Sequence, residues 1–283
     1  MARRTPFMPA SWKGPAAYVI VGGWCAFAVF LVMWVALASV NNNRGLFGAP
    51  LQLPAHPAFG NYPKVWIANH FGEYFLNSFL VVSGSVVVLL LVAVPAAYVL
   101  SRGKFAGRRT FLSLFVFGMG VPTPLLFIPL VVLLTELRLV DTLLGLGIAY
   151  VSLSLPFTIY VLQGFFSSLP SELDSAAIID GCSDWQIFWY VMLPLAAPGA
   201  ATVAVLNFIA LWNEYQLSLV LINSAENRTL SLGIYSLISS MQYSGGNWPG
   251  LFAGVTMVML PTIALYTFLS ERMIGGMTMG SVK

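Results

Sequence analysis

The sequence is short of charged residues. Only 8% of its 283 residues are charged, 13 basic and 10 acidic side chains, whereas a soluble domain of this length would carry about 70. Hydrophobic residues make up 58%. So few charges cannot cover a surface that faces water, which excludes a soluble globular enzyme, a disordered protein and a protein that coats nucleic acid. The expected surroundings are membrane lipid.

Cysteine and histidine are also scarce. Cys25 and Cys182 lie in segments of different character and indicate no disulfide. The spacing of His56 and His70 does not match a set of metal ligands, so we predict no metal site. The sequence has no Gly-x-x-x-x-Gly-Lys-Ser/Thr loop, no HExxH and no Gly-x-Ser-x-Gly. We therefore predict a non-catalytic chain that binds no cofactor itself.

Long apolar runs take the place of charge. A helix needs about 20 apolar residues to cross a bilayer. Six segments reach this length; five contain no charged residue, and the sixth contains only Glu214. The first is too long for a signal-peptide core and predicts an uncleaved anchor. The sequence thus predicts an all-α integral membrane protein with six transmembrane helices, over residues 17–40, 74–100, 110–135, 142–169, 195–225 and 249–270.

Basic residues set the expected orientation. With the N-terminus inside, nine Lys and Arg residues lie on the cytoplasmic side and four on the other, and the densest cluster is in the loop 101–109. The positive-inside rule then predicts cytoplasmic tails, 1–16 and 271–283, on either side of a transmembrane domain, 17–270. Four prolines in the outer stretch 41–73 exclude a single helix there.

Glycine and proline interrupt the third predicted span. Such breaks are either hinges for a conformational change or kinks buried against neighbouring helices, and the sequence does not separate the two. The interrupting residues are Gly118, Gly120, Pro122, Pro124 and Pro129.

The cytoplasmic loop 170–194 has the pattern of two short capped helices. Ser171 and Ser183 are each followed three residues later by a residue that completes a capping-box spacing. Gly181 between them is a natural helix end. We expect one helix over 172–180 and a second over 184–192, the second ended by Leu193-Pro194.

This loop is acidic and contains no Lys or Arg. Because the cytoplasmic leaflet is anionic, the loop is repelled from lipid and is either a solvated connector or a docking element for a cytoplasmic partner. Leu173, Ala176 and Ala177 offer one side of the first helix small enough for a close approach. The acidic residues are Glu172, Asp174, Asp180 and Asp184.

The loop resembles the cytoplasmic signature of ABC importer permeases, which reads Glu-Ala-Ala, three residues, Gly, nine residues, Ile, one residue, Leu-Pro. This sequence keeps the spacing throughout. It departs at Ser175, where the family has Glu, and at Val191, where it has Ile. The loss of that Glu leaves Asp174 and Glu172 as possible partners for a basic residue of the ATPase. The matching residues are Ser175-Ala176-Ala177, Gly181, Val191 and Leu193-Pro194.

Other segments are similar to the carbohydrate-uptake branch of this family, the type of the maltose-system inner-membrane permease. The resemblance covers nearly the whole chain from the first span onward. The similar segments are Asn61-Tyr62, Asn77-Ser78-Phe79, Ala97-Tyr98-Val99-Leu100-Ser101-Arg102, Ile179-Asp180-Gly181, Leu211-Trp212-Asn213-Glu214-Tyr215 and Gly280-Ser281-Val282-Lys283.

The resemblance implies a type I importer permease fold in a bacterial inner membrane and no nucleic-acid partner. It implies a second homologous permease, two ATP-binding subunits that hold ATP and Mg, and an extracytoplasmic solute-binding protein. The loop helix would contact the ATPase through Glu172, Asp174, Ser175, Ala176, Ala177, Asp180, Gly181, Val191, Leu193 and Pro194, and the tail through Gly280, Ser281, Val282 and Lys283.

The fifth predicted span carries the polar residues expected along a sugar pathway, where hydroxyl partners and aromatic faces are needed. Glu214 serves either the substrate or a contact between helices, and Trp212 and Tyr215 are equally suited to anchoring at the membrane interface. A proton- or sodium-coupled carrier is one alternative, and an importer for a polyol or glycerol phosphate is another. The candidates are Asn207, Trp212, Asn213, Glu214, Tyr215 and Gln216.

Overall fold

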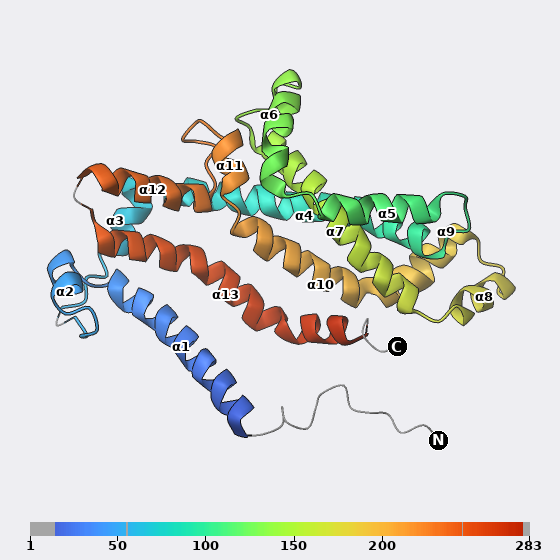
Figure 1. Ribbon diagram of the computed structural model, residues 1–283, viewed down its shortest axis with the longest axis horizontal. Helices are drawn as coiled ribbons and strands as arrows, with labels where there is room; N and C mark the ends of the chain where they lie inside the picture. The colour runs from blue at the N-terminus through green and yellow to red at the C-terminus, as the bar shows by residue number, and fades with distance from the viewer. Residues whose placement is uncertain (1–14, 55, 245, 280–283) are drawn as a thin grey trace. The chain divides into compact units, whose positions relative to one another are not determined.

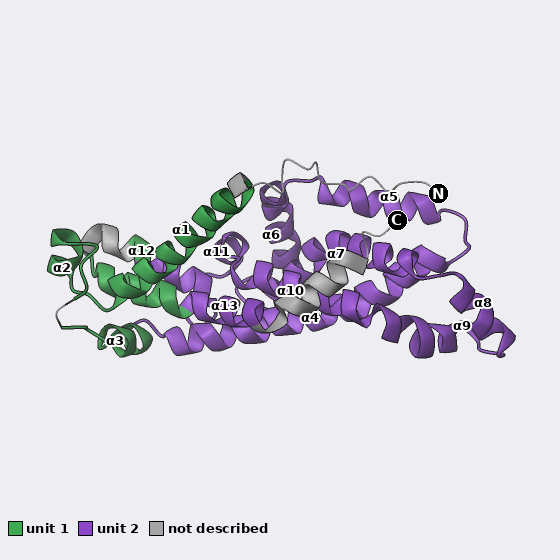
Figure 2. Cartoon of the chain, turned by 90° about the horizontal axis from the view of Figure 1, so that it is seen from below, with its two compact units in different colours: residues 1–68, 238–257 green, residues 69–237, 258–283 purple. Residues whose placement is uncertain are grey.

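The computed structural model describes residues 15–54, 56–244 and 246–279, and all regular secondary structure within them is helical. The predicted all-α class is therefore confirmed. The chain divides into two compact units (Figure 2). Unit 1 consists of Met1–Ala68 and Ile238–Met257, and unit 2 of Asn69–Leu237 and Val258–Lys283.

Side-chain amides hold unit 1 together. The Asn61 amide donates to the backbone oxygens of Ser39 (2.8 Å) and Asn41 (3.0 Å), and the Asn43 amide donates to that of Gly246 (2.9 Å). These bonds satisfy carbonyls that the ends of helices leave free. The stretch 41–73 is indeed no single helix. The helices that lie wholly in unit 1 are α1 (Pro15–Ser39), α2 (Asn43–Gly48) and α3 (Asn61–Ala68).

Unit 2 holds most of the remaining helices (Figure 2). They are α4 (Phe71–Arg102), α5 (Arg108–Met119), the 3-10 helix η2 (Thr123–Leu126), α6 (Phe127–Glu136), α7 (Leu143–Ser168), α8 (Glu172–Ile179), α9 (Asp184–Gln186), the π-helix η3 (Ile187–Met192), α10 (Leu193–Trp212) and α11 (Gln216–Leu221). Two helices contribute residues to both units, α12 (Leu230–Ser244) and α13 (Trp248–Met279).

The core of unit 2 is built on α4 and α7, the most extensive helix pair of the chain. Ala93 and Ala97 of α4 are fully buried, and such small side chains let neighbouring backbones approach closely. Gly199 of α10 serves the same purpose, because a Cβ there would lie 2.6 Å from the Phe165 ring of α7. Helices α4, α7 and α10 therefore form a tightly packed body from which the short helices extend.

Five helices within the described residues are long and apolar enough to cross a membrane, and a sixth span is counted if α5 and η2–α6 are taken together. That pair is bent by 100° around Gly120 and Pro122. The third predicted span is thus a broken helix, interrupted where the glycines and prolines cluster.

The bounds of the fifth predicted span, 195–225, are wrong at both ends. The apolar helix runs over Asp184–Trp212. It stops there because polar side chains satisfy the backbone: the Asn213 amide donates to the Ile209 carbonyl (2.8 Å), and the Leu217 N–H donates to Glu214 (2.6 Å). After this break the chain forms the separate helix α11.

The predicted stop at Leu193-Pro194 is also wrong. Helices α9, η3 and α10 follow one another without a gap. In the π-turn the Leu193 N–H donates to the Phe188 oxygen, five residues back. Pro194 follows directly and, having no N–H, omits one bond of the run without ending the helix. The helix therefore continues through the proline.

Candidate functional site

Helix α8 ends in a Schellman motif. Gly181 has a φ of +80°, the Gly181 N–H donates to the Ile178 oxygen, and the Cys182 N–H donates to the Ala177 oxygen, both at 3.0 Å. Few side chains adopt this left-handed backbone without strain, which explains the glycine. The C-terminal end of α8 is thus fixed in the way that the spacing predicts.

The N-terminal end of α8 is not capped as predicted. Ser171 has a helical backbone and makes no capping bond. Asp174, the expected second member of the capping box, instead lies 3.0 Å from an Arg102 guanidinium nitrogen. Both side chains are mostly buried, 15% and 25% exposed. Asp174 therefore pairs with a charged residue of another helix and does not take part in the local capping box.

Arg102 joins three helices at this point. It is the last residue of α4, and its second guanidinium nitrogen donates to the oxygens of Phe166 (2.8 Å) and Leu169 (2.5 Å) at the end of α7. Beside it, the Ser101 and Ser167 hydroxyls lie 2.9 Å apart. One side chain thus satisfies two carbonyls that α7 leaves free and holds the carboxylate of α8.

A cavity of about 750 Å³ opens beside this ion pair. The end of α4 and the turn after it supply Tyr98 and Lys104, and the 170–194 loop supplies Ser171, Ser175 and Asp184. Figure 1 shows α8 and α9 at one end of unit 2, beside the turn that joins α4 to α5. Two stretches far apart in the sequence therefore meet at this end.

The exposed side of α8 differs from the predicted one. Ala177 is buried and Leu173 is half-buried against the core, so only Ala176 of the expected small face is open. Two isoleucines are strongly exposed instead, Ile178 by 61% and Ile179 by 84%. The other open residues of this segment are Glu172, Ser175, Asp180 and Gly181.

The second capping box forms as predicted. The Ser183 backbone N–H donates to the Gln186 side-chain oxygen (2.8 Å), and the Gln186 N–H donates back to the Ser183 hydroxyl (3.4 Å). Beyond it, Val191 and Leu193 pack against the core and Pro194 is exposed. The signature residues Val191 and Leu193 therefore help to hold this helical segment against the core.

Two of the pathway candidates are parts of the packed body. Asn207 is 5% exposed, and its amide donates to the Thr158 hydroxyl (3.0 Å) and the Val203 oxygen (2.9 Å). Trp212 is 2% exposed, and its indole N–H donates to the Val258 oxygen (3.2 Å). Both polar groups are satisfied by neighbouring helices, as buried groups must be.

Glu214 is half-buried in a hydrogen-bonded network. One carboxylate oxygen accepts from the Leu217 N–H (2.6 Å), and the other accepts from the Tyr150 hydroxyl (3.0 Å) and the Ser218 N–H (3.3 Å). The carboxylate therefore begins α11 and ties it to α7.

Three pathway candidates remain exposed at the break between α10 and α11, namely Asn213, Tyr215 and Gln216. The Tyr215 ring is stacked on that of Tyr235, with centroids 5.5 Å apart. The C-terminal candidates Gly280, Ser281, Val282 and Lys283 lie outside the described residues.

Sequence reasoning missed a second anchoring residue, Asp141. It has a φ of +60°, and one carboxylate oxygen accepts from the backbone N–H groups of Asn223 and Ser224, both at 2.9 Å. These bonds, that of the Ser224 N–H above all, hold the pKa of Asp141 below its ordinary 3.8. The Asn227 amide donates to the Asp141 backbone oxygen (2.6 Å). Neither Asp141 nor Arg102 has a local pattern, because each bonds to residues far along the chain.

Comparison with known proteins identifies the kind of transporter. Residues 89–275 match the family described as "Binding-protein-dependent transport system inner membrane component". The chain belongs to this family. It is an ABC transporter permease, a non-catalytic multi-pass protein of a bacterial inner membrane, and its transport system includes a solute-binding protein.

The permease is similar over nearly its whole length to curated relatives. It is 35% identical to the diacetylchitobiose uptake system permease protein NgcG of Streptomyces coelicolor, covering 92% of this chain and 86% of the relative. It is 27% identical to the galactooligosaccharides transport system permease protein GanQ of Bacillus subtilis, covering 94% of each. A chain in the crystal structure of a bacterial ABC transporter involved in the import of the acidic polysaccharide alginate matches with a TM-score of 0.81 at 26% identity, over 94% of this chain and 99% of that one. The predicted importer permease fold is confirmed.

Proposed function

We propose that this permease carries an oligosaccharide into the cell. The names of its relatives refer to diacetylchitobiose, galactooligosaccharides and alginate, three different sugars of more than one unit. They favour an oligosaccharide as the substrate class over a polyol or glycerol phosphate. Membership of a binding-protein-dependent family argues against the proton- or sodium-coupled carrier.

The energy for transport comes, in this proposal, from two ATPase subunits that hold ATP and Mg and act on α8. The observation that carries it is the anchoring of α8: a Schellman motif at Gly181 fixes one end, and the Arg102–Asp174 pair ties the other to α4 and α7. A helix fixed in this way moves together with the spans. Its exposed isoleucines, Ile178 and Ile179, are the surface that an ATPase would cover.

Both termini lie in the cytoplasm in this arrangement, which follows from the distribution of Lys and Arg. A second, homologous permease completes the membrane part, and residues 280–283 provide a further contact with the ATPases. We place the sugar path of this chain at the α10–α11 break, where Asn213, Tyr215 and Gln216 are exposed. Asn207 and Trp212 support that break from inside the body.

The ATPase contact can be tested by copurification. We expect Ile179→Ser to reduce the amount of ATPase that copurifies with the tagged permease at least fivefold, while the second permease still copurifies. Leu51→Ser is the matched control, because Leu51 is 71% exposed and lies in the outer stretch 41–73. Equal amounts of ATPase with both variants would contradict the role of α8.

Substrate class is tested with the complete transporter in proteoliposomes that contain ATP. We expect uptake of a labelled chito- or galactooligosaccharide that depends on the solute-binding protein and is unaffected by proton and sodium ionophores. Uptake of glycerol phosphate or a polyol in its place would overturn the substrate class. Uptake by this chain alone, driven by an ion gradient, would overturn the mechanism.

A further inference from the structure

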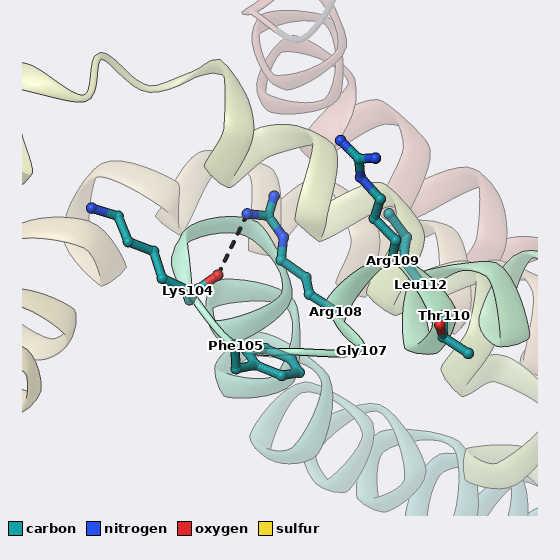
Figure 3. A pocket seen from close by; sticks show the side chains of 8 residues that line it. Lys104, Phe105, Gly107, Arg108, Arg109, Thr110 and Leu112 are labelled. Atoms are coloured by element: carbon teal, nitrogen blue, oxygen red, sulfur yellow. Dashed lines mark hydrogen bonds between the residues drawn. The ribbon is translucent and has the colours of Figure 1, made fainter.

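The turn between α4 and α5 forms a basic cavity. Its volume is about 680 Å³. In Figure 3 the side chains of Lys104, Arg108 and Arg109 extend to one side of the turn, with Arg108 in the middle. The other lining residues are Gly103, Phe105, Gly107, Thr110 and Leu112, so no carboxylate lines the cavity.

The three cations have no acidic partner among the residues that the structure describes. The ion pairs there are His70–Glu73 and Arg102–Asp174. Arg108 is half-buried and donates only to backbone oxygens, those of Leu100 (2.7 Å) and Gly103 (3.5 Å). These bonds hold one guanidinium in place between two exposed cations. Three uncompensated charges around a cavity of this size create a positive potential that favours an anion.

The surroundings of the cavity indicate where that anion comes from. Helix α5 begins at Arg108 and has exposed apolar side chains along its length: Phe111 by 51%, Leu114 by 60% and Phe117 by 76%. The Phe105 and Phe111 rings lie 6.3 Å apart at the start of this helix. A span whose apolar surface starts one turn after a basic cluster places that cluster at the level of the lipid headgroups.

We propose that this cavity binds the headgroup phosphate of an anionic phospholipid such as phosphatidylglycerol. The planar guanidinium of Arg109 suits a phosphate because it donates two parallel hydrogen bonds, and Lys104 adds a point charge. The connection between the helices is only the short segment 103–107, so the cations stay at the membrane surface. The acyl chains of the bound lipid would lie along the exposed apolar side of α5.

The site can be tested on the full-length permease in a neutral detergent. The apparent Kd for dioleoyl phosphatidylglycerol is measured from the rise in unfolding temperature during a titration, and dioleoyl phosphatidylcholine and free glycerol phosphate are titrated in parallel. We expect stabilisation by phosphatidylglycerol alone. Arg109→Gln should weaken its binding about fivefold, and Lys104→Gln with Arg109→Gln about 25-fold.

Two further variants separate the site from general charge effects. Arg109→Lys keeps the charge but not the planar fork, so its loss should be smaller than that of Arg109→Gln. Arg138→Gln removes an exposed arginine from the turn between α6 and α7 and should leave the Kd within twofold. Lys104 also lines the cavity beside Asp174, so substituting it changes the surroundings of α8 as well. The single Arg109 variants are therefore the decisive test.

Several results would overturn the proposal. Equal affinity for phosphatidylcholine, or an equal loss with Arg138→Gln, would show binding without this site. Stabilisation by glycerol phosphate as strong as that by the lipid would assign the cavity to a free phosphate. An unchanged lipid affinity in the double variant, together with loss of the copurifying ATPase, would assign it to an acidic protein surface.

Discussion

Arg102 and Asp174 connect the end of a long span to the short helix α8, across 72 residues of sequence and a gap of 3.0 Å between charged atoms. The same guanidinium also satisfies two carbonyls at the end of α7. The two residues are therefore not equivalent. Removing Asp174 breaks one bond, whereas removing Arg102 also leaves backbone groups of α7 without a partner.

Substitutions at this pair should differ accordingly. We expect Asp174→Asn to cost about 1 kcal/mol and Arg102→Met about 3 kcal/mol, because the second change leaves the Phe166 and Leu169 oxygens unpaired. Both should lower sugar uptake for each ATP hydrolysed. Unfolding temperature and the ratio of uptake to hydrolysis check this, with the exposed Glu136→Gln of α6 as control. Equal stability of the two variants would contradict the asymmetry.

Gly181 should tolerate only residues that adopt a left-handed backbone. Nothing lies within 4 Å of a Cβ at this position, so only backbone strain opposes a side chain. Gly181→Ala should cost about 1 kcal/mol and Gly181→Asn less, and Gly181→Asp should uncouple hydrolysis from uptake while the chain still inserts. Gly164→Ala places a methyl group in equally open space but inside α7, so the free energy of unfolding should stay the same or increase. Unfolding temperatures of the four variants check the changes in stability, and the ratio of uptake to ATP hydrolysis checks Gly181→Asp.

Glu214 and Tyr150 should behave as a structural pair. Their hydrogen bond of 3.0 Å joins the start of α11 to α7. We expect Glu214→Gln to cost about 2 kcal/mol and Tyr150→Phe about 1 kcal/mol, since both weaken the same part-buried bond and the first also weakens the bonds that start α11. Maximal uptake should fall with both while KM stays unchanged. An increase in KM with Glu214→Gln alone would instead indicate direct contact with the sugar.

The bonds of Asp141 should make stability depend on pH. Because the pKa of Asp141 is lower in the folded chain than the ordinary 3.8, its carboxylate stabilises the fold at pH values above about 4, and this contribution is lost as the pH falls through the folded pKa. The unfolding temperature measured from about pH 6 to pH 3 should therefore fall less in Asp141→Asn than in the wild type. Parallel curves for the two proteins would contradict this assignment.

Local sequence patterns predicted the features that depend on residues close together in the sequence. The spans follow from uncharged apolar runs, the α8 end from Gly181, and the α9 cap from Ser183 and Gln186. The Ser171 cap failed because Arg102, remote in sequence, is a stronger partner for Asp174. Periodicity also could not distinguish Asn207, buried between two helices, from exposed Asn213, because both lie in the same apolar stretch.

The helical run from Asp184 to Trp212 has a mechanical consequence. It has 29 residues, so at 1.5 Å per residue it is roughly 40 Å long, and tilting it by about 5° displaces its far end by about 3.5 Å. Because the helix continues through Pro194, a movement at one end is carried into the other. A small rotation of the helix near Ser183 therefore moves Asn213, at the other end of the run, by a larger distance than it moves the residues next to Ser183.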